Sequence, residues 1–181
     1  MFVLVEYTAL LGAVSTAADS VAKGKSLEDL IAYLLEAIPG YIGLRRNTLN
    51  DFATEEIDIS YMHQQDREGL WFLPPLLLVE CKNWSHPVDS QATSYFADRV
   101  RSRGCEVGIL VAASGITGRA VGPTAAQFVS AMHLARDGIR ILVVTLQDLQ
   151  RVRSPADFIV LLRDVLLDMV ASGSYLPSRQ S

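Results

Sequence analysis

A glutamate and a lysine stand at the end of the most apolar segment of the chain, in the stretch LLLVECKNW over residues 76–84. Burying an unpaired charge costs several kcal/mol, so each of these groups needs an opposite charge or a metal ion beside it. In a strand, Glu80 and Lys82 project from the same face, and Cys81 projects from the other. The pair therefore predicts a polar site at one end of a buried strand.

A second carboxylate precedes this pair in the stretch EIDIS, where Asp58 lies between two isoleucines and so faces away from both. If the two strands pair, Asp58 and Glu80 converge on one point. Two carboxylates in contact repel each other, and a hard divalent cation with oxygen ligands removes that repulsion. Lys82 beside them would offset negative charge and could hold or deprotonate a water molecule. The three residues predict a site for metal-assisted hydrolysis.

The elements that must position these residues alternate between helices and strands. The first helix of the main domain is predicted to begin at Ser26 as N-cap, with Asp29 approximating a capping box, and to end before Pro39. The remaining periodicity predicts strands over 41–46, 55–62, 76–82, 106–114 and 138–146, a linker over about 63–75, and helices over 89–104, 118–136 and 154–173. This order predicts an α/β fold, an α/β/α sandwich with a mixed central sheet.

The length and composition of the chain are those of one globular domain. The periodicity of its apolar residues places this domain at residues 23–175, and a disordered tail is expected over 176–181. Residues 1–22 are apolar but carry Glu6 and lack a basic start, so we expect a helix packed on the domain or on a second subunit of a homodimer, and no membrane span. Two cysteines without regular spacing fit a reducing cytoplasm. The net charge of −4 argues against a general nucleic-acid coat but leaves room for a local basic groove.

Asp58, a linker and Glu80-Cys81-Lys82 together resemble the PD-(D/E)xK nuclease superfamily, which has the restriction-endonuclease-like fold. The stretch GKSLEDLIAYLLEAIPGY looks like the first helix of that superfamily, and GILVAASGITGRA with the later IRILVVTLQDL resembles its Mrr-like branch. The similarity runs from about Lys23 to Leu149. One departure is that Ile57, and not a proline, precedes Asp58.

The resemblance implies a role for each residue of this motif. Asp58 and Glu80 would ligate Mg²⁺, for which Mn²⁺ could substitute, and the backbone carbonyl of Cys81 would be a third ligand. Lys82 would orient the attacking water and stabilise the pentacovalent phosphate. The implied activity is Mg²⁺-dependent endonucleolytic cleavage of DNA.

The resemblance also points to residues on two helices. Glu28 would complete the site through a water or a second metal ion, and it lies at the edge of the apolar stripe of its helix, whereas Glu36 lies opposite. The alternative is that Glu28 only complements the helix dipole. Gln91 and Tyr95 share one face of the helix after the catalytic strand and would lie near the scissile phosphate. The alternative there is a helix edge with one buried tyrosine.

Other side chains could contact the substrate. Arginines at the ends of predicted elements could bind phosphates, against the alternative that each is simply solvated; they are Arg45, Arg46, Arg99, Arg101 and Arg103. Asn83 and Trp84, directly after Lys82, could line the cleft, and simple packing is the alternative for Trp84.

Two other functions stay open at this stage. The chain could be a catalytically silent module that uses this fold to bind nucleic acid or a protein partner, which its acidic charge favours. It could also hydrolyse other phosphoesters with the same site and no basic groove. If the substrate is DNA, a protein partner could supply affinity that an acidic chain lacks.

Overall fold

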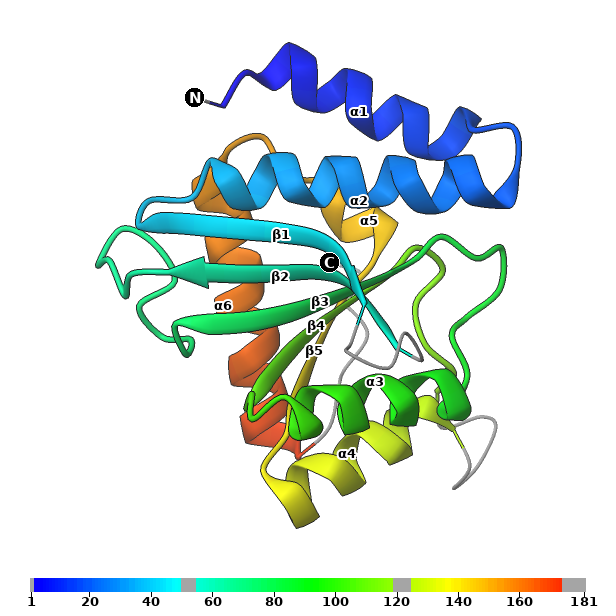
Figure 1. Ribbon diagram of the computed structural model, residues 1–181, viewed down its shortest axis with the longest axis vertical. Helices are drawn as coiled ribbons and strands as arrows, with labels where there is room; N and C mark the ends of the chain where they lie inside the picture. Colours follow the sequence, from blue (N-terminus) through cyan, green and yellow to red (C-terminus); the bar gives the residue numbers. More distant parts are fainter. Residues whose placement is uncertain (1, 50–54, 119–124, 174–181) are drawn as a thin grey trace.

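A computed structural model describes residues 2–49, 55–118 and 125–173, which form a five-stranded sheet flanked by helices (Figure 1). The strands follow one another across the sheet in chain order: β1 (Tyr41–Leu49), β2 (Glu56–His63), β3 (Leu76–Lys82), β4 (Val107–Ala112) and β5 (Arg140–Val144). The pairings β1–β2 and β2–β3 are antiparallel, and β3–β4 and β4–β5 are parallel. The predicted mixed sheet is confirmed.

Helices cover both faces of the sheet. One face carries α2 (Ser20–Glu36) and α6 (Pro155–Ser172), and the other carries α3 (Ser90–Ser102) and α4 (Ala126–Asp137). The helix α1 (Leu4–Thr16) lies outside α2, and the short α5 (Leu146–Leu149) follows β5 (Figure 1). The arrangement is the α/β/α sandwich that the sequence predicts.

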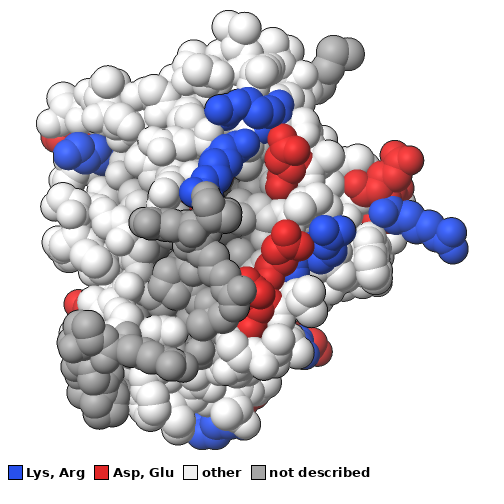
Figure 2. Space-filling view, turned by 180° about the vertical axis from the view of Figure 1, so that it is seen from behind, with Lys and Arg blue, Asp and Glu red and all other residues white. Residues whose placement is uncertain are grey.

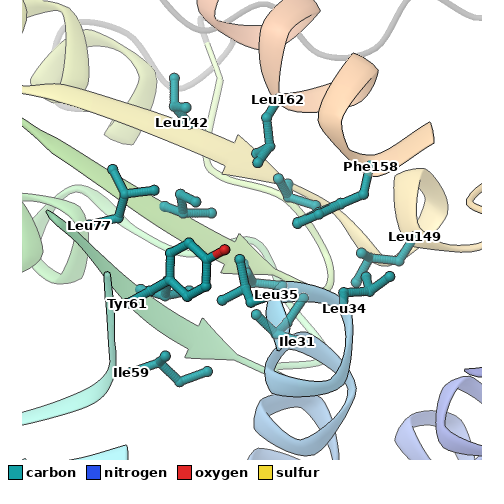
Figure 3. Close-up of a cluster of buried hydrophobic side chains, with 14 of the residues drawn as sticks. Ile31, Leu34, Leu35, Ile59, Tyr61, Leu77, Leu142, Leu149, Phe158 and Leu162 are labelled. Carbon is teal, nitrogen blue, oxygen red and sulfur yellow. The ribbon is translucent and has the colours of Figure 1, made fainter. Parts of the chain in front are cut away.

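The larger core lies between the sheet and the helices α2 and α6 (Figure 3). Leu34 and Leu35 of α2 and Phe158 and Leu162 of α6 are fully buried against the strands, together with Tyr61 of β2. Full burial of one such side chain stabilises the fold by about 1.5–3 kcal/mol. This packing holds α2 firmly across the sheet and thereby fixes the position of Glu28.

The second core lies between the sheet and α3. Phe96 and Val100 of α3 are buried against β4, where Gly108 leaves room for them. A Cβ atom on Gly108 would lie 2.6 Å from Val100 Cγ2 and 2.8 Å from Phe96 Cζ, which is closer than real carbon atoms approach. The absence of a side chain at this position therefore lets α3 lie close to the sheet.

The first helix, α1, packs on the rest of the fold through a few buried residues. Tyr7 is fully buried, and its hydroxyl donates a hydrogen bond of 2.7 Å to the carbonyl oxygen of Leu149. Its outward side remains apolar, since Leu4 and Val5 are exposed. No helix in the described ranges is long and apolar enough to cross a membrane.

The predicted start of the first helix of the main domain is wrong. The helix α2 begins at Ser20, and its N-cap is Asp19, whose carboxylate accepts a hydrogen bond from the amide of Ala22. Ser26 lies inside the helix, and its hydroxyl donates to the carbonyl oxygen of Lys23. Asp29 does not complete a capping box, because it forms ion pairs instead.

Three other boundaries also differ from the prediction. The helix expected from Gly118 begins at Ala126, and Gly118 is not helical. The last strand ends at Val144, because Thr145 caps α5 through a reciprocal pair of hydrogen bonds with Asp148. The first strand is longer than expected and continues past Arg46 to Leu49. The tail predicted for residues 176–181 lies outside the described residues.

Candidate active site

The two predicted carboxylates meet where β2 begins and β3 ends. In the β2–β3 ladder Ile59 lies opposite Val79, so one step further along both strands Asp58 lies opposite Glu80. The ladder ends at this point, and the amide of Cys81 donates a hydrogen bond of 2.7 Å to Asp58 Oδ2. The Cys81 side chain lies on the other face, in the larger core. The structure thus brings Asp58 and Glu80 together at one end of the sheet.

Glu80 is the most buried charged group of this site, with only 4% of its side chain exposed. Lys82 Nζ lies 2.6 Å from Glu80 Oε1, and an Arg99 guanidinium nitrogen lies 2.8 Å from Glu80 Oε2. Two cations therefore satisfy one buried carboxylate, as the cost of burying a charge requires.

Asp58 is held in a less favourable environment. Burial and, after it, the charge of Glu80 raise the pKa of Asp58 to about 6, against the opposing effects of the Cys81 amide and Lys82. Glu28 also raises the pKa of Asp58, to a smaller extent, so its carboxylate lies within electrostatic range. Ionised Asp58 thus lacks sufficient positive charge nearby, which is the condition that a bound cation would relieve.

Glu28 reaches this region from α2, but its carboxylate is already paired. Arg46 of β1 lies 3.2 Å from Glu28 Oε2 and 2.6 Å from Asp29 Oδ1. Burial raises the pKa of Asp29, but the hydrogen bonds from Lys25 and Arg46 outweigh this effect, so the pKa is lowered. Glu36, the alternative on the same helix, is exposed to solvent.

No group of three or more His, Cys, Asp or Glu residues within the described ranges is arranged so that it could hold a metal ion. Glu28 contacts Arg46, and Glu80 contacts Lys82 and Arg99. The chemistry of the donors nevertheless fits a hard divalent cation, since Asp58 and Glu80 offer carboxylate oxygens side by side.

The helix α3 carries a row of polar side chains toward this site. Gln91, Tyr95 and Arg99 are spaced four residues apart, so they lie on one face of the helix. Gln91 Nε2 donates a hydrogen bond of 3.0 Å to the Tyr95 hydroxyl, and Arg99 contacts Glu80. Tyr95 is 56% exposed, so the alternative of a buried tyrosine is wrong.

The sequence predicts Arg99 as a phosphate-binding or a solvated arginine and does not reveal its contact with Glu80. The spacing from Gln91 and Tyr95 was the signal that could have identified it. Its two neighbours point elsewhere: Arg101 pairs with acidic residues of α3 and α4, and Arg103 pairs with Glu55.

The remaining predicted substrate-binding residues lie at the margin of the site. Asn83 Nδ2 donates hydrogen bonds to the carbonyl oxygens of Val14 and Lys23, so this side chain joins the end of β3 to α1 and α2. Arg45 is exposed on the edge strand β1. In the described part of the face seen in Figure 2, basic and acidic side chains are interspersed and form no continuous basic band.

Comparison with known protein families gives a match over most of the chain. A family model described as a restriction endonuclease, Mrr_cat, matches residues 20–152. The matched segment begins at the first residue of α2 and contains the whole sheet, and with it Glu28, Asp58, Glu80, Lys82 and Arg99. No curated protein matches the chain.

Proposed function

The chain belongs to the restriction endonuclease family Mrr_cat, within the PD-(D/E)xK nuclease superfamily, and on that premise we propose that it is a metal-dependent endonuclease that hydrolyses DNA phosphodiester bonds. The observation that carries this proposal is the cluster of Asp58, Glu80 and Lys82 at the shared end of β2 and β3, with Lys82 Nζ 2.6 Å from Glu80. A degenerate, non-catalytic member would be expected to have lost at least one of these three residues.

The proposed cofactor is Mg²⁺, with Mn²⁺ as a substitute. Asp58, Glu80 and the backbone carbonyl of Cys81 would hold it, and Glu28 would contribute through a water molecule or a second ion. A bound divalent cation polarises the phosphoryl oxygens and lowers the pKa of a bound water. The raised pKa of Asp58 supports this assignment, because burial and, after it, the charge of Glu80 disfavour the ionised carboxylate, and a bound cation would favour it.

Lys82 is proposed to act on the attacking water. Its ammonium group already stands beside Glu80 at the strand end, with a quarter of its side chain exposed, so it can contact both the carboxylate and a water molecule. A fixed ammonium at this position would orient the water and stabilise negative charge on the phosphate as it develops.

Arg46 and Arg99 are proposed to exchange partners when substrate binds. Each now pairs with a carboxylate of the site, and Arg46 Nε is buried without a hydrogen-bond partner among the described residues. A guanidinium binds a phosphate in the same bidentate manner as a carboxylate. Gln91 and Tyr95 would extend this contact along α3, with Arg45 and Asn83 at its margin.

A second function, a catalytically silent module that binds nucleic acid or a protein partner, is favoured by one observation, the net charge of −4. An acidic chain gains little from phosphate neutralisation, so DNA affinity would come from a local groove or from a protein partner.

Both cysteines are free and buried, which fits a reducing cytoplasm as the working compartment.

One experiment separates the two functions. Purified protein is incubated with plasmid, linear duplex and single-stranded DNA in Mg²⁺, Mn²⁺ or EDTA, beside the variants Lys82→Ala and Arg163→Ala. Arg163 is an exposed cation on α6, on the opposite side of the sheet from α3, and serves as the matched control. We expect metal-dependent cleavage by the wild type and by Arg163→Ala, and none by Lys82→Ala. Cleavage by Lys82→Ala at the wild-type rate would remove Lys82 from the mechanism, and DNA binding without cleavage in any metal would favour the silent module.

A further inference from the structure

An open pocket of about 530 Å³ lies directly beside the candidate active site. It is formed where three segments meet: the start of α2, the loop after β3 and the start of α3. Its lining includes Asp19, Lys23, Trp84, His86 and Asp89. Asn83, which is proposed above to lie at the margin of the substrate contact, also lines this pocket.

One side of the pocket is aromatic. The rings of Trp84 and His86 lie 5.3 Å apart, inclined at 44°. Trp84 is held in place because it packs against the second core and its carbonyl oxygen accepts a hydrogen bond of 2.7 Å from Ser114. His86 is exposed. An aromatic surface that is anchored on one side and open on the other is suited to stacking with a planar ligand.

The aromatic side is joined to the catalytic residues through Lys82. The ammonium of Lys82 lies 5.8 Å from the centre of the Trp84 ring while it contacts Glu80 at 2.6 Å. A ligand stacked on Trp84 would therefore lie close to a phosphate held near Lys82.

The polar side of the pocket favours a base over a phosphate. Asp19 and Asp89 each use Oδ1 to cap a helix, at 2.8 Å from the amide of Ala22 and 2.9 Å from that of Ala92. These carboxylates repel a phosphate but accept hydrogen bonds from the amino groups of a base. Lys23 supplies the single positive charge of the lining.

We propose that this pocket binds an unpaired base of the DNA strand adjacent to the cleaved phosphate. The proposal rests on the proposed nuclease function and adds a substrate class to it. A base in a continuous duplex is stacked and paired, so it cannot enter the pocket without being extruded. DNA with a single-stranded end, a mismatch or a gap near the cut is therefore the preferred substrate.

Tryptophan fluorescence can report on the pocket directly. The chain contains two tryptophans, and Trp71 lies in the connection at the opposite end of β2 and β3, so a Trp71→Phe protein has Trp84 as its only reporter. This protein is titrated in EDTA, without cleavage, with a single-stranded oligonucleotide, with the blunt duplex of the same sequence, and with heparin, a polyanion without bases. We expect saturable quenching by the single strand only. Equal quenching by heparin, or none by the single strand, would overturn the proposal.

Variants test the same contact by the anisotropy of a labelled oligonucleotide. Loss of one base–aromatic stack weakens binding by roughly 5- to 150-fold, which we expect for Trp84→Ala, while Trp84→Phe keeps most of the affinity. His86→Ala removes the exposed ring of the same aromatic pair. It tests the contact even if Trp84→Ala does not fold. Trp71→Ala is the matched tryptophan control. Single-strand affinity unchanged in His86→Ala, and in Trp84→Ala where that variant folds, would overturn the proposal.

The two proposals can fail separately. If the wild type cleaves duplex DNA but the single strand neither quenches Trp84 nor binds preferentially, the pocket proposal fails and the nuclease stands. If the single strand quenches Trp84 but no DNA is cleaved in Mg²⁺ or Mn²⁺, the nuclease proposal fails and the pocket is a nucleic-acid-binding site of a silent module.

Discussion

Replacing Asp58 by asparagine should make the metal-free protein more stable and, at the same time, less responsive to metal. Asparagine keeps the size of the side chain and an oxygen that can accept the hydrogen bond from the Cys81 amide, but it removes the charge that Glu80 repels. A structural aspartate would behave in the opposite way, because its neutralisation would remove a favourable ion pair.

The magnitude follows from the pKa of Asp58, which rises from 3.8 to about 6 on folding. When the pKa of a carboxyl group is higher in the native state than in the unfolded state, the unfolded state releases the proton more readily. The free energy of unfolding therefore falls as the pH rises from about 4 to 6. Two pKa units correspond to about 3 kcal/mol, and partial exposure reduces this to about 2–3 kcal/mol. For a chain of this size the difference in melting temperature above pH 7 is about 4–10 °C.

The assay is thermal unfolding of both proteins in EDTA from pH 4 to pH 8, followed by titration with Mn²⁺ at pH 8. The variant should melt higher at pH 8, and the difference should disappear near pH 4. At ten times the Kd, Mn²⁺ should stabilise the wild type by about 1.4 kcal/mol and the variant by much less. Asp29→Asn is the matched control and should melt lower, because Asp29 pairs with Lys25 and Arg46. A variant of Asp58 that melts below the wild type in EDTA and responds fully to Mn²⁺ would refute the metal-site assignment.

Three further predictions concern other contacts. Arg99→Gln removes one of the two cations on Glu80, so it should lower the melting temperature in EDTA by a few degrees and enlarge the Mn²⁺-induced shift; an unchanged shift would show that Arg99 does not compete with metal. If the exposed apolar side of α1 forms a homodimer, Val5→Glu should give a monomer by light scattering without loss of folding, and a wild type that is already monomeric would exclude the dimer. Tyr7→Phe should cost about 1–2 kcal/mol in urea denaturation, because the carbonyl of Leu149 loses its hydrogen bond, and a cost near zero would show that α1 is not held there.

The buried strands and the meeting of Asp58 with Glu80 could be predicted because both depend on local patterns. An unbroken apolar run predicts a strand covered on both faces, and residue parity within two paired strands decides which side chains share a face. The start of α2 could not be predicted in this way, since residues 20–26 are mostly polar and lack the apolar stripe that reveals the rest of the helix.

The charged partners of the site were harder to predict, because they come from elements that are distant in sequence. Arg99 and Glu80 are 19 residues apart, and Arg46 and Glu28 are 18 residues apart. Three arginines stand at alternate positions at the end of α3, the last of them as its C-cap, and their type alone does not distinguish the one that turns inward. Which arginine faces the site depends only on how far along the sheet α3 lies and how it is rotated about its axis. Both are set by the packing of its uncharged residues.

Because the position of α3 depends on uncharged packing residues, Gly108 matters in any search for inactive variants. It has no functional group, and yet even an alanine there would push Phe96 and Val100 outward, and α3 with them. A displacement of about 1 Å can reduce the rate of an enzyme by roughly 100-fold when it moves a positioning residue, and Arg99 is carried by the same helix. We therefore expect random mutagenesis to recover Gly108 beside the acidic residues and Lys82 among loss-of-activity substitutions. A screen that discards glycine positions in the interior as merely structural would overlook it.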